Sequence, residues 1–176
     1  MQVHALMRSA PLTCTLADTL DRAARHMWEG DLGAVPVLED ERVVGMLTDR
    51  DLCMASYTQG RPLHQIRVAD VTSQRVVSVG PNETIREAAR RMREHQVRRL
   101  PVLDDDGRLV GMLSLGDLSR EASSDEIGRT LSAISAPWGE QPKTRFMDPL
   151  RKAVGFGLLA LGALGALPLV RAFATR

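Results

Sequence analysis

The feature that most constrains this chain is an internal repeat. Residues 3–40 align with residues 68–105 at a constant offset of 65, and residues 45–52 align with residues 111–118 at an offset of 66. The change in offset places one added residue in the second copy, near Gly107. A repeat of this length predicts one supersecondary unit used twice, in which each copy needs the other to bury its apolar face.

Each copy predicts the order strand, helix, strand, strand, helix, which gives an α/β (α+β) fold with pseudo-twofold symmetry. In the first copy we expect strands at residues 11–15, 35–38 and 43–47, a helix capped by Asp18 or Thr19, and a closing helix from Thr48. In the second copy we expect strands at residues 76–79, 100–103 and 109–113, a helix capped by Asn82, and a closing helix from Ser114. Acidic turns at residues 39–41 and 104–107 join the last two strands of each copy, and they lack the ligand alternation of a calcium loop.

These patterns divide the chain into four parts. Residues 1–60 form the first repeat and residues 66–122 the second, and residues 56–65, with Gly60 and Pro62, connect them. Residues 123–149 contain an amphipathic helix at 125–135 and a Pro-rich joint. Residues 150–172 contain a hydrophobic helix.

Composition excludes several functional classes. The net charge is +1 and the chain has six Phe, Trp and Tyr residues in all, too few for a base-stacking platform, so we expect no nucleic-acid partner. The two cysteines, Cys14 and Cys53, have no metal-ligand spacing, and we expect buried free thiols and no metal. The four histidines form no catalytic constellation, and the chain has no phosphate-binding or nucleophile motif, so we expect no enzyme.

Both copies share the signature G-M-L-[TS]-x-x-D-L, preceded by an apolar-Pro-apolar triplet. Thr48 with Asp51, and Ser114 with Asp117, have the form of capping boxes, and this local role alone explains the motif. The same atoms also make a helix N-terminus suited to an anion, with a carboxylate one turn further that can accept hydrogen bonds from a ribose diol. The residues alone leave both interpretations open.

This signature, in two tandem copies over about residues 1–122, resembles the CBS domain and the CBS pair, or Bateman module. The resemblance implies an adenosine-containing ligand (AMP, ADP, ATP or S-adenosylmethionine) in a cleft between the repeats, with Thr48 and Ser114 toward phosphate and Asp51 and Asp117 toward ribose. It also implies that the segments around Pro36 and Pro101 frame the adenine ring, and that Thr13 and Ser78 line the pocket. The adenine-framing residues are therefore expected to be Val35, Pro36, Val37, Leu100, Pro101 and Val102. A homodimer formed through the helices is a further implication.

The two copies differ in their arginines. Arg50 follows Thr48, whereas its counterpart is Gly116, and Arg98 and Arg99 stand where the first copy has Gly33 and Ala34. A guanidinium can hold phosphate in a bidentate manner, so Arg50 and Arg99 are candidate phosphate ligands. The alternative is that they are surface charges or contacts to a protein partner.

The end of the chain is strongly apolar. Residues 153–170, AVGFGLLALGALGALPLV, contain no charged or polar side chain, and as a helix they span about 27 Å, close to the thickness of a bilayer core. Lys143, Arg145, Arg151 and Lys152 precede the segment, which predicts a membrane anchor with the repeats on the cytoplasmic side. A docking or dimerisation helix of a soluble protein is the alternative.

We therefore expect a regulatory, non-enzymatic module, with no cofactor, that senses an adenosyl ligand. It is cytoplasmic and tethered to a membrane through its tail, or cytoplasmic throughout. The alternative function is a ligand-independent scaffold, in which the Thr/Asp and Ser/Asp pairs serve only as helix caps.

Overall fold

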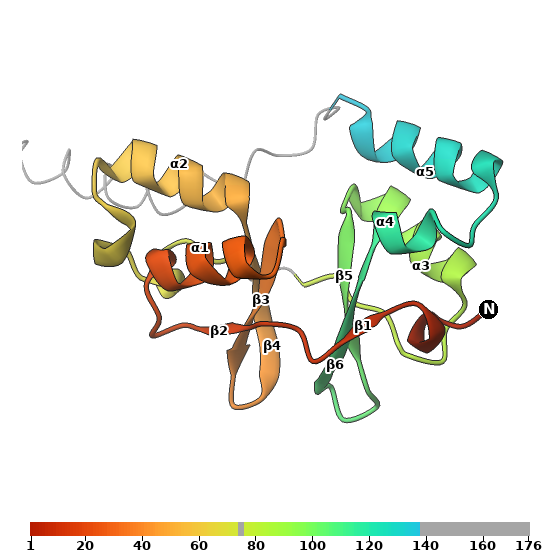
Figure 1. The fold of residues 1–176 in the computed structure, drawn as a ribbon, viewed down its shortest axis with the longest axis horizontal. Coiled ribbons are helices and arrows are strands. Elements are labelled where there is room, and N and C mark those ends of the chain that lie inside the picture. Colours follow the sequence, from red (N-terminus) through yellow and green to blue (C-terminus); the bar gives the residue numbers. More distant parts are fainter. Residues whose placement is uncertain (74–75, 138–176) are drawn as a thin grey trace, which may run out of the picture. The chain divides into compact units, whose positions relative to one another are not determined.

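The computed structural model describes residues 1–73 and 76–137, which lie in one compact unit (Figure 1). The first repeat contains β2 (Cys14–Thr15), α1 (Leu20–Glu29), β3 (Ala34–Glu39), β4 (Arg42–Thr48) and α2 (Asp49–Gln59). Its leading segment contains the 3-10 turn η1 (Val3–Ala5) and β1 (Arg8–Ser9). The 3-10 turn η2 (Leu63–Gln65) lies between the repeats, and the 3-10 turn η3 (Val68–Asp70) lies in the leading segment of the second repeat. The second repeat contains α3 (Ile85–His95), β5 (Arg99–Leu103), β6 (Leu109–Ser114) and α4 (Leu115–Leu118), and α5 (Ser124–Ser135) follows it.

Each repeat has its own apolar core beneath a three-stranded sheet. The first sheet has the order β2-β3-β4 and the second β1-β6-β5. Leu20, Ala23 and Met27 of α1 pack on the first sheet, and Ala88, Ala89 and Met92 of α3 pack on the second, as the spacing of apolar residues predicts. The mixed α/β fold and its internal repeat are therefore confirmed.

The two repeats are joined by an exchange of their leading segments. Arg8 and Ser9 of β1, in the leading segment of the first repeat, pair with Met112 and Gly111 of β6 in the second. Ser73, in the leading segment of the second repeat, forms the corresponding bridge to Met46 of β4 in the first. Each copy therefore receives an extended segment from the chain that leads into the other.

The glycine of the shared signature lies under these crossing segments. A Cβ added at Gly45 would come within 2.1 Å of Thr72 Cγ2 and 2.7 Å of the Ser73 carbonyl oxygen, and at Gly111 within 2.7 Å of Met7 Sδ and 3.0 Å of the Arg8 carbonyl oxygen. The signature begins with glycine because the other segment's backbone lies where a side chain would be.

The hairpins explain why the alignment offset between the two copies changes from 65 to 66 residues. β3 and β4 are joined by the two residues Asp40 and Glu41, both at positive φ, whereas β5 and β6 are joined by a longer turn that ends at Gly107, also at positive φ. A two-residue loop with both φ values positive is a type I′ turn, and a longer loop with glycine in the left-handed region is the next common hairpin. The added residue of the second copy therefore lies in its turn.

The closing helices differ between the copies. α2 is a full helix, but α4 ends after one turn, and α5 then packs against α3. Arg93 of α3 pairs with Glu126 of α5 and donates a hydrogen bond to Thr130 Oγ1 at 3.0 Å, while Gln96 Nε2 donates to the Ala133 carbonyl oxygen. The amphipathic helix predicted at residues 125–135 is confirmed as α5.

Four local predictions are wrong. Thr84, not Asn82, caps α3 by accepting a hydrogen bond from the Glu87 amide. The first strands are shorter than predicted, with only residues 14–15 in the first copy and a single bridge at Val79 in the second, because each meets its sheet at its end alone. The start of the predicted linker, residues 56–59, is the last turn of α2. Cys14 is buried as predicted, but Cys53 lies on the exposed face of α2.

The predicted membrane anchor at residues 153–170 lies outside the described residues, as does the predicted joint from residue 138 onward. Among residues 1–73 and 76–137, no helix is long and apolar enough to cross a bilayer.

Candidate functional site

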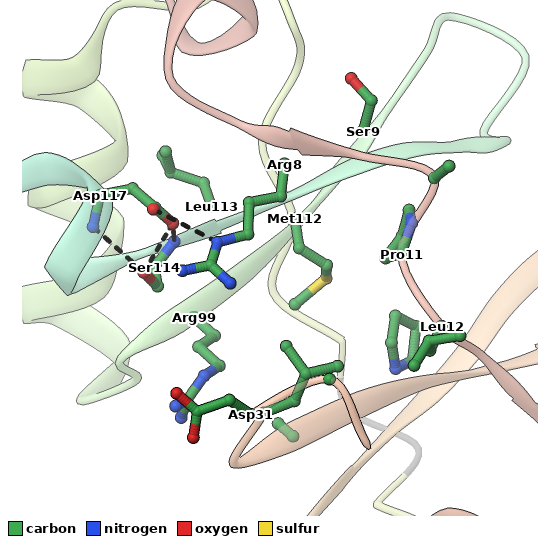
Figure 2. Close-up of a pocket in the computed structure, with 15 residues that line it drawn as sticks. Arg8, Ser9, Pro11, Leu12, Asp31, Arg99, Met112, Leu113, Ser114 and Asp117 are labelled. Carbon is green, nitrogen blue, oxygen red and sulfur yellow. Dashed lines mark hydrogen bonds and ion pairs between the residues drawn. The ribbon is translucent and has the colours of Figure 1, made fainter. Parts of the chain in front are cut away.

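The candidate site is a pocket of about 250 Å³ lined by both repeats and by the segment that crosses between them (Figure 2). The crossing segment contributes residues 8–12, and the first repeat contributes residues 30–32 with Ala34 and Pro36. The second repeat contributes Arg99, residues 112–114 and Asp117. The pocket therefore lies over the signature motif of the second copy.

The pocket has apolar walls with polar groups at one end. Leu12, Pro36, Met112 and Leu113 supply apolar surface, and Figure 2 shows Ser114, Asp117 and Arg8 gathered together, with Arg99 nearby. An elongated ligand with a flat apolar part and a polar or charged part matches this distribution.

Ser114 and Asp117 form the capping box that the sequence predicts. The Asp117 amide donates a hydrogen bond to Ser114 Oγ at 3.1 Å, and Asp117 Oδ2 accepts from the Ser114 amide at 2.8 Å. The Ser114 hydroxyl also donates to Oδ2, at 2.6 Å. One oxygen of the carboxylate is therefore committed to the local structure.

The other oxygen of Asp117 is held by two arginines. Arg120 Nη2 donates a hydrogen bond to Oδ1 at 2.7 Å, and Arg8 Nε lies 3.7 Å from the same atom. Asp117 is 1% exposed. Burial alone raises the pKa of this carboxyl, but the hydrogen bonds from Ser114 and Arg120 outweigh it and hold the pKa below its usual value. Asp117 is therefore a buried anion at neutral pH.

Arg99 reaches from the second repeat across to the first. A Cβ placed on Gly33 would lie 2.9 Å from Arg99 Nη2, so the guanidinium lies directly against the backbone of Gly33. Asp31, in the loop before β3, lines the same side of the pocket. Arg99, one of the two predicted phosphate ligands, thus faces the pocket at the junction of the repeats.

Successive residues of a strand point to opposite faces of the sheet, and this separates the other predicted site residues into those that face the pocket and those that do not. Pro36 lines the pocket, whereas Val35 and Val37 are fully buried in the core of the first repeat, and Leu100 and Val102 are fully buried in that of the second. Pro101 is buried outside this pocket. Thr13 and Ser78 do not line it either, and the carbonyl oxygen of Ser78 accepts a hydrogen bond from Arg91.

The equivalent motif of the first repeat stands apart from this pocket. Thr48 and Asp51 form the same capping box, with Asp51 Oδ2 accepting from the Thr48 amide at 2.7 Å. Arg50 is exposed, and its amide donates to Asp49 Oδ1 at 2.7 Å, so Asp49 already supplies the anion at this helix N-terminus. The counterpart of Asp49 in the second repeat is Leu115.

The anion site predicted at a helix N-terminus in the second repeat stays a prediction, and the helix there is shorter than expected. α4 has only four residues, and its first amide, from Leu115, donates to the Arg98 carbonyl oxygen at 2.9 Å. So short a helix has little macrodipole, and the positive charge of the pocket comes from Arg8 and Arg99 instead.

Sequence reasoning missed Arg8, Leu12 and Asp31. Arg8 precedes the motif of the first repeat yet serves the pocket of the second, and its counterpart in the repeat is Ser73. Only the exchange of leading segments reveals this. Within the described part of the chain, no group of three or more His, Cys, Asp or Glu side chains is arranged to hold a metal ion.

Comparison with known proteins agrees with this architecture. The family model of the CBS domain matches twice, over residues 3–57 and 68–124. The chain belongs to the CBS domain family. The two CBS domains account for both copies of the repeat and for every element that lines the pocket.

Similar proteins include other CBS pairs. The CBS domain-containing protein YhcV of Bacillus subtilis is 38% identical over 130 residues, covering 73% of this chain and 91% of that protein. Hypoxic response protein 1 of Mycobacterium tuberculosis is 35% identical over 131 residues, with the same two coverages, 73% and 91%. A solved structure of CBSX2 in complex with AMP is 27% identical, with a TM-score of 0.59, and covers 68% of this chain and 93% of CBSX2.

Proposed function

We propose that this protein is a regulatory module that binds an adenosine-containing ligand in the pocket over Ser114 and Asp117. The observation that carries the proposal is the pocket itself, where an apolar slot between the CBS domains ends at a buried carboxylate and two arginines. CBSX2, which shares the fold, was solved with AMP, and this supports an adenine nucleotide as the ligand class.

We assign roles to four of the predicted residues that line this pocket. The adenine ring is expected against Pro36 and the neighbouring apolar walls, the ribose hydroxyls toward Asp117 Oδ1, and a phosphate toward Ser114 and Arg99. Binding would fix the junction between the domains, because Arg99 and Gly33 come from different repeats and lie in contact. A change at this junction is the signal that a partner would detect.

Thermal unfolding of the full chain with AMP, ADP, ATP, S-adenosylmethionine and GTP tests the proposal. A ligand at 100 times its dissociation constant stabilises the fold by about 2.7 kcal/mol, which raises the melting temperature by several degrees. We expect a shift with at least one adenosyl ligand and none with GTP. Asp117→Asn should abolish the shift, and Asp125→Asn, an exposed carboxylate of α5 outside the pocket, should leave it unchanged.

One observation favours the alternative of a ligand-independent scaffold. Both oxygens of Asp117 are already engaged, one by Ser114 and one by Arg120 with Arg8, so the residue has a complete structural role without a ligand. No shift with any of the five compounds would establish this second function over the first.

Two further parts of the proposal concern the assembly. Homodimer formation through the helices stays a prediction, and light scattering of the purified full chain in detergent tests it. A membrane tether through residues 153–170 also stays a prediction, since that segment lies outside the described residues.

A further inference from the structure

Arg8 lies beside the carboxylate oxygen to which the proposed function assigns the ribose. Its Nε lies 3.7 Å from Asp117 Oδ1, the one carboxylate oxygen that the capping box leaves for a ligand (Figure 2). A ribose diol needs that oxygen as its acceptor. A ribose hydroxyl at this oxygen would compete with the Arg8 guanidinium for it.

Arg8 is the arginine that can move. Its side chain is 61% exposed and its contact to Asp117 is long, whereas Arg120 donates to the same atom at 2.7 Å and lies outside the pocket lining. Because the Arg8 end of this pair is exposed and 3.7 Å is too long for a hydrogen bond, breaking the contact costs little. Displacing Arg8 also leaves Asp117 paired with Arg120, so no buried charge is left alone.

A displaced Arg8 remains in the pocket. Its backbone is fixed by the pairing of β1 with β6, opposite Met112, and Arg99 lines the same pocket. Of the two acidic residues in the lining, Asp31 and Asp117, Arg8 pairs with Asp117, so a neutral ligand that displaces Arg8 leaves its guanidinium without this partner. A phosphate supplies a new anionic partner, with charge-assisted hydrogen bonds.

We propose that Arg8 selects for phosphorylated ligands by exchanging Asp117 for the ligand's phosphate. In the empty pocket Arg8 pairs with Asp117, and in the occupied pocket Asp117 accepts from the ribose while Arg8 binds the 5′-phosphate. The proposal rests on the proposed function and deepens it: the ligand class is an adenosine 5′-phosphate, and adenosine without a phosphate binds weakly.

Calorimetric titration of the full chain with AMP and with adenosine tests the exchange in the wild type and in Arg8→Gln. In the variant, AMP affinity should fall about tenfold, the equivalent of one hydrogen bond to a charged group, while adenosine affinity does not fall, because Asp117 Oδ1 is no longer shared with Arg8. The preference for AMP over adenosine is therefore lost. Arg22→Gln is the matched control, since Arg22 is a 60% exposed arginine of α1 that pairs with Asp18, outside the pocket.

The outcomes separate the two proposals. If the wild type binds AMP and Arg8→Gln keeps the same ratio of AMP to adenosine affinity, Arg8 is not the selecting residue, although the proposed function stands. If the wild type binds neither compound while thermal unfolding shows no shift with any adenosyl ligand, both proposals are overturned. Equal affinity of the wild type for AMP and adenosine also overturns the exchange.

Discussion

At the scale of single residues, the first hairpin holds a conformation that its sequence does not favour. Asp40 and Glu41 have φ values of 48° and 65°, in the left-handed region. Aspartate tolerates this region because its short side chain can bond to the local backbone, but glutamate does not have that advantage. The second hairpin places Gly107 at its left-handed position and avoids the cost.

Glu41→Gly should therefore stabilise the protein by about 0.5–1 kcal/mol, the relief of backbone strain less the greater freedom of glycine in the unfolded chain. Urea unfolding measures the change. Glu39→Gly is the control, because Glu39 is in the extended strand β3, where glycine should destabilise by a similar amount. Equal effects at both positions would contradict the argument.

Residue-level prediction from the sequence succeeded where the signal is local. The capping boxes of Thr48 with Asp51 and of Ser114 with Asp117 were predictable because a cap depends only on neighbours three residues away. The orientation of Val35, Val37 and Pro36 was not, since a buried run of apolar residues does not reveal which strand face meets the core. The sequence did not predict Arg8 as a site residue, because its place in the pocket depends on the pairing of β1 with β6, which are far apart in the chain.

At the scale of elements, the close approach of each crossing segment to its sheet depends on one glycine. Gly45 lies under the backbone of Ser73, with 2.7 Å between an added Cβ and the carbonyl oxygen. Gly111 lies under Met7 and Arg8, where the nearest atom is a flexible methionine sulfur and the backbone oxygen is 3.0 Å away.

Gly45→Ala should therefore destabilise the fold more than Gly111→Ala, with losses of about 1–3 kcal/mol at sites where an added methyl forces a backbone shift. Chemical unfolding of both variants measures the difference. Gly128→Ala, in α5 where an added Cβ meets nothing within 4 Å, should stabilise slightly and serves as the control. A larger loss at Gly111 would show that β1 is the more rigid of the two segments.

We expect the docking of α5 on α3 to depend on pH through the ion pair of Arg93 with Glu126. The ion pair with Arg93 holds the pKa of Glu126 below its usual value of 4.5. A lowered pKa in the folded state means that the contribution to stability is present above about pH 4.5 and is lost as the pH falls through the lowered pKa.

Glu126→Gln should therefore be less stable than the wild type at pH 7, and the difference should shrink as the pH falls below 4.5. Thermal unfolding across this range measures it. Glu121→Gln, an exposed glutamate before α5, should behave like the wild type at every pH. A difference between Glu126→Gln and the wild type that stays constant to low pH would contradict the role of the charge.

At the scale of the whole molecule, the membrane anchor predicted at residues 153–170 can be tested by extraction. If it spans a bilayer, the full chain should stay with membranes after carbonate extraction, because 18 residues without a polar side chain are costly to expose to water. A chain ending at Ala136 should be extracted in full. Release of the full chain into the soluble fraction would favour the alternative of a docking or dimerisation helix.

The sequence predicted the repeated architecture better than the contacts between distant segments of the chain. Two aligned copies with matching periodicity required one fold used twice, and the apolar faces of α1 and α3 were readable from spacing alone. The sequence did not predict that α4 ends after one turn, and it did not predict the exchange of leading segments. Both depend on tertiary contacts, of α5 with α3 and of β1 with β6, that no local pattern records.

The exchange of β1 also sets an order of events during synthesis. Arg8 and Ser9 leave the ribosome early, but their partners Met112 and Gly111 are among the last residues of the second domain to be made. Until then the first residues of the chain have no sheet to join, and β6 has an open edge when it emerges. Completion of the pocket is therefore a late step of folding, and a nascent chain cut short before residue 112 lacks the wall of the pocket that residues 112–117 supply.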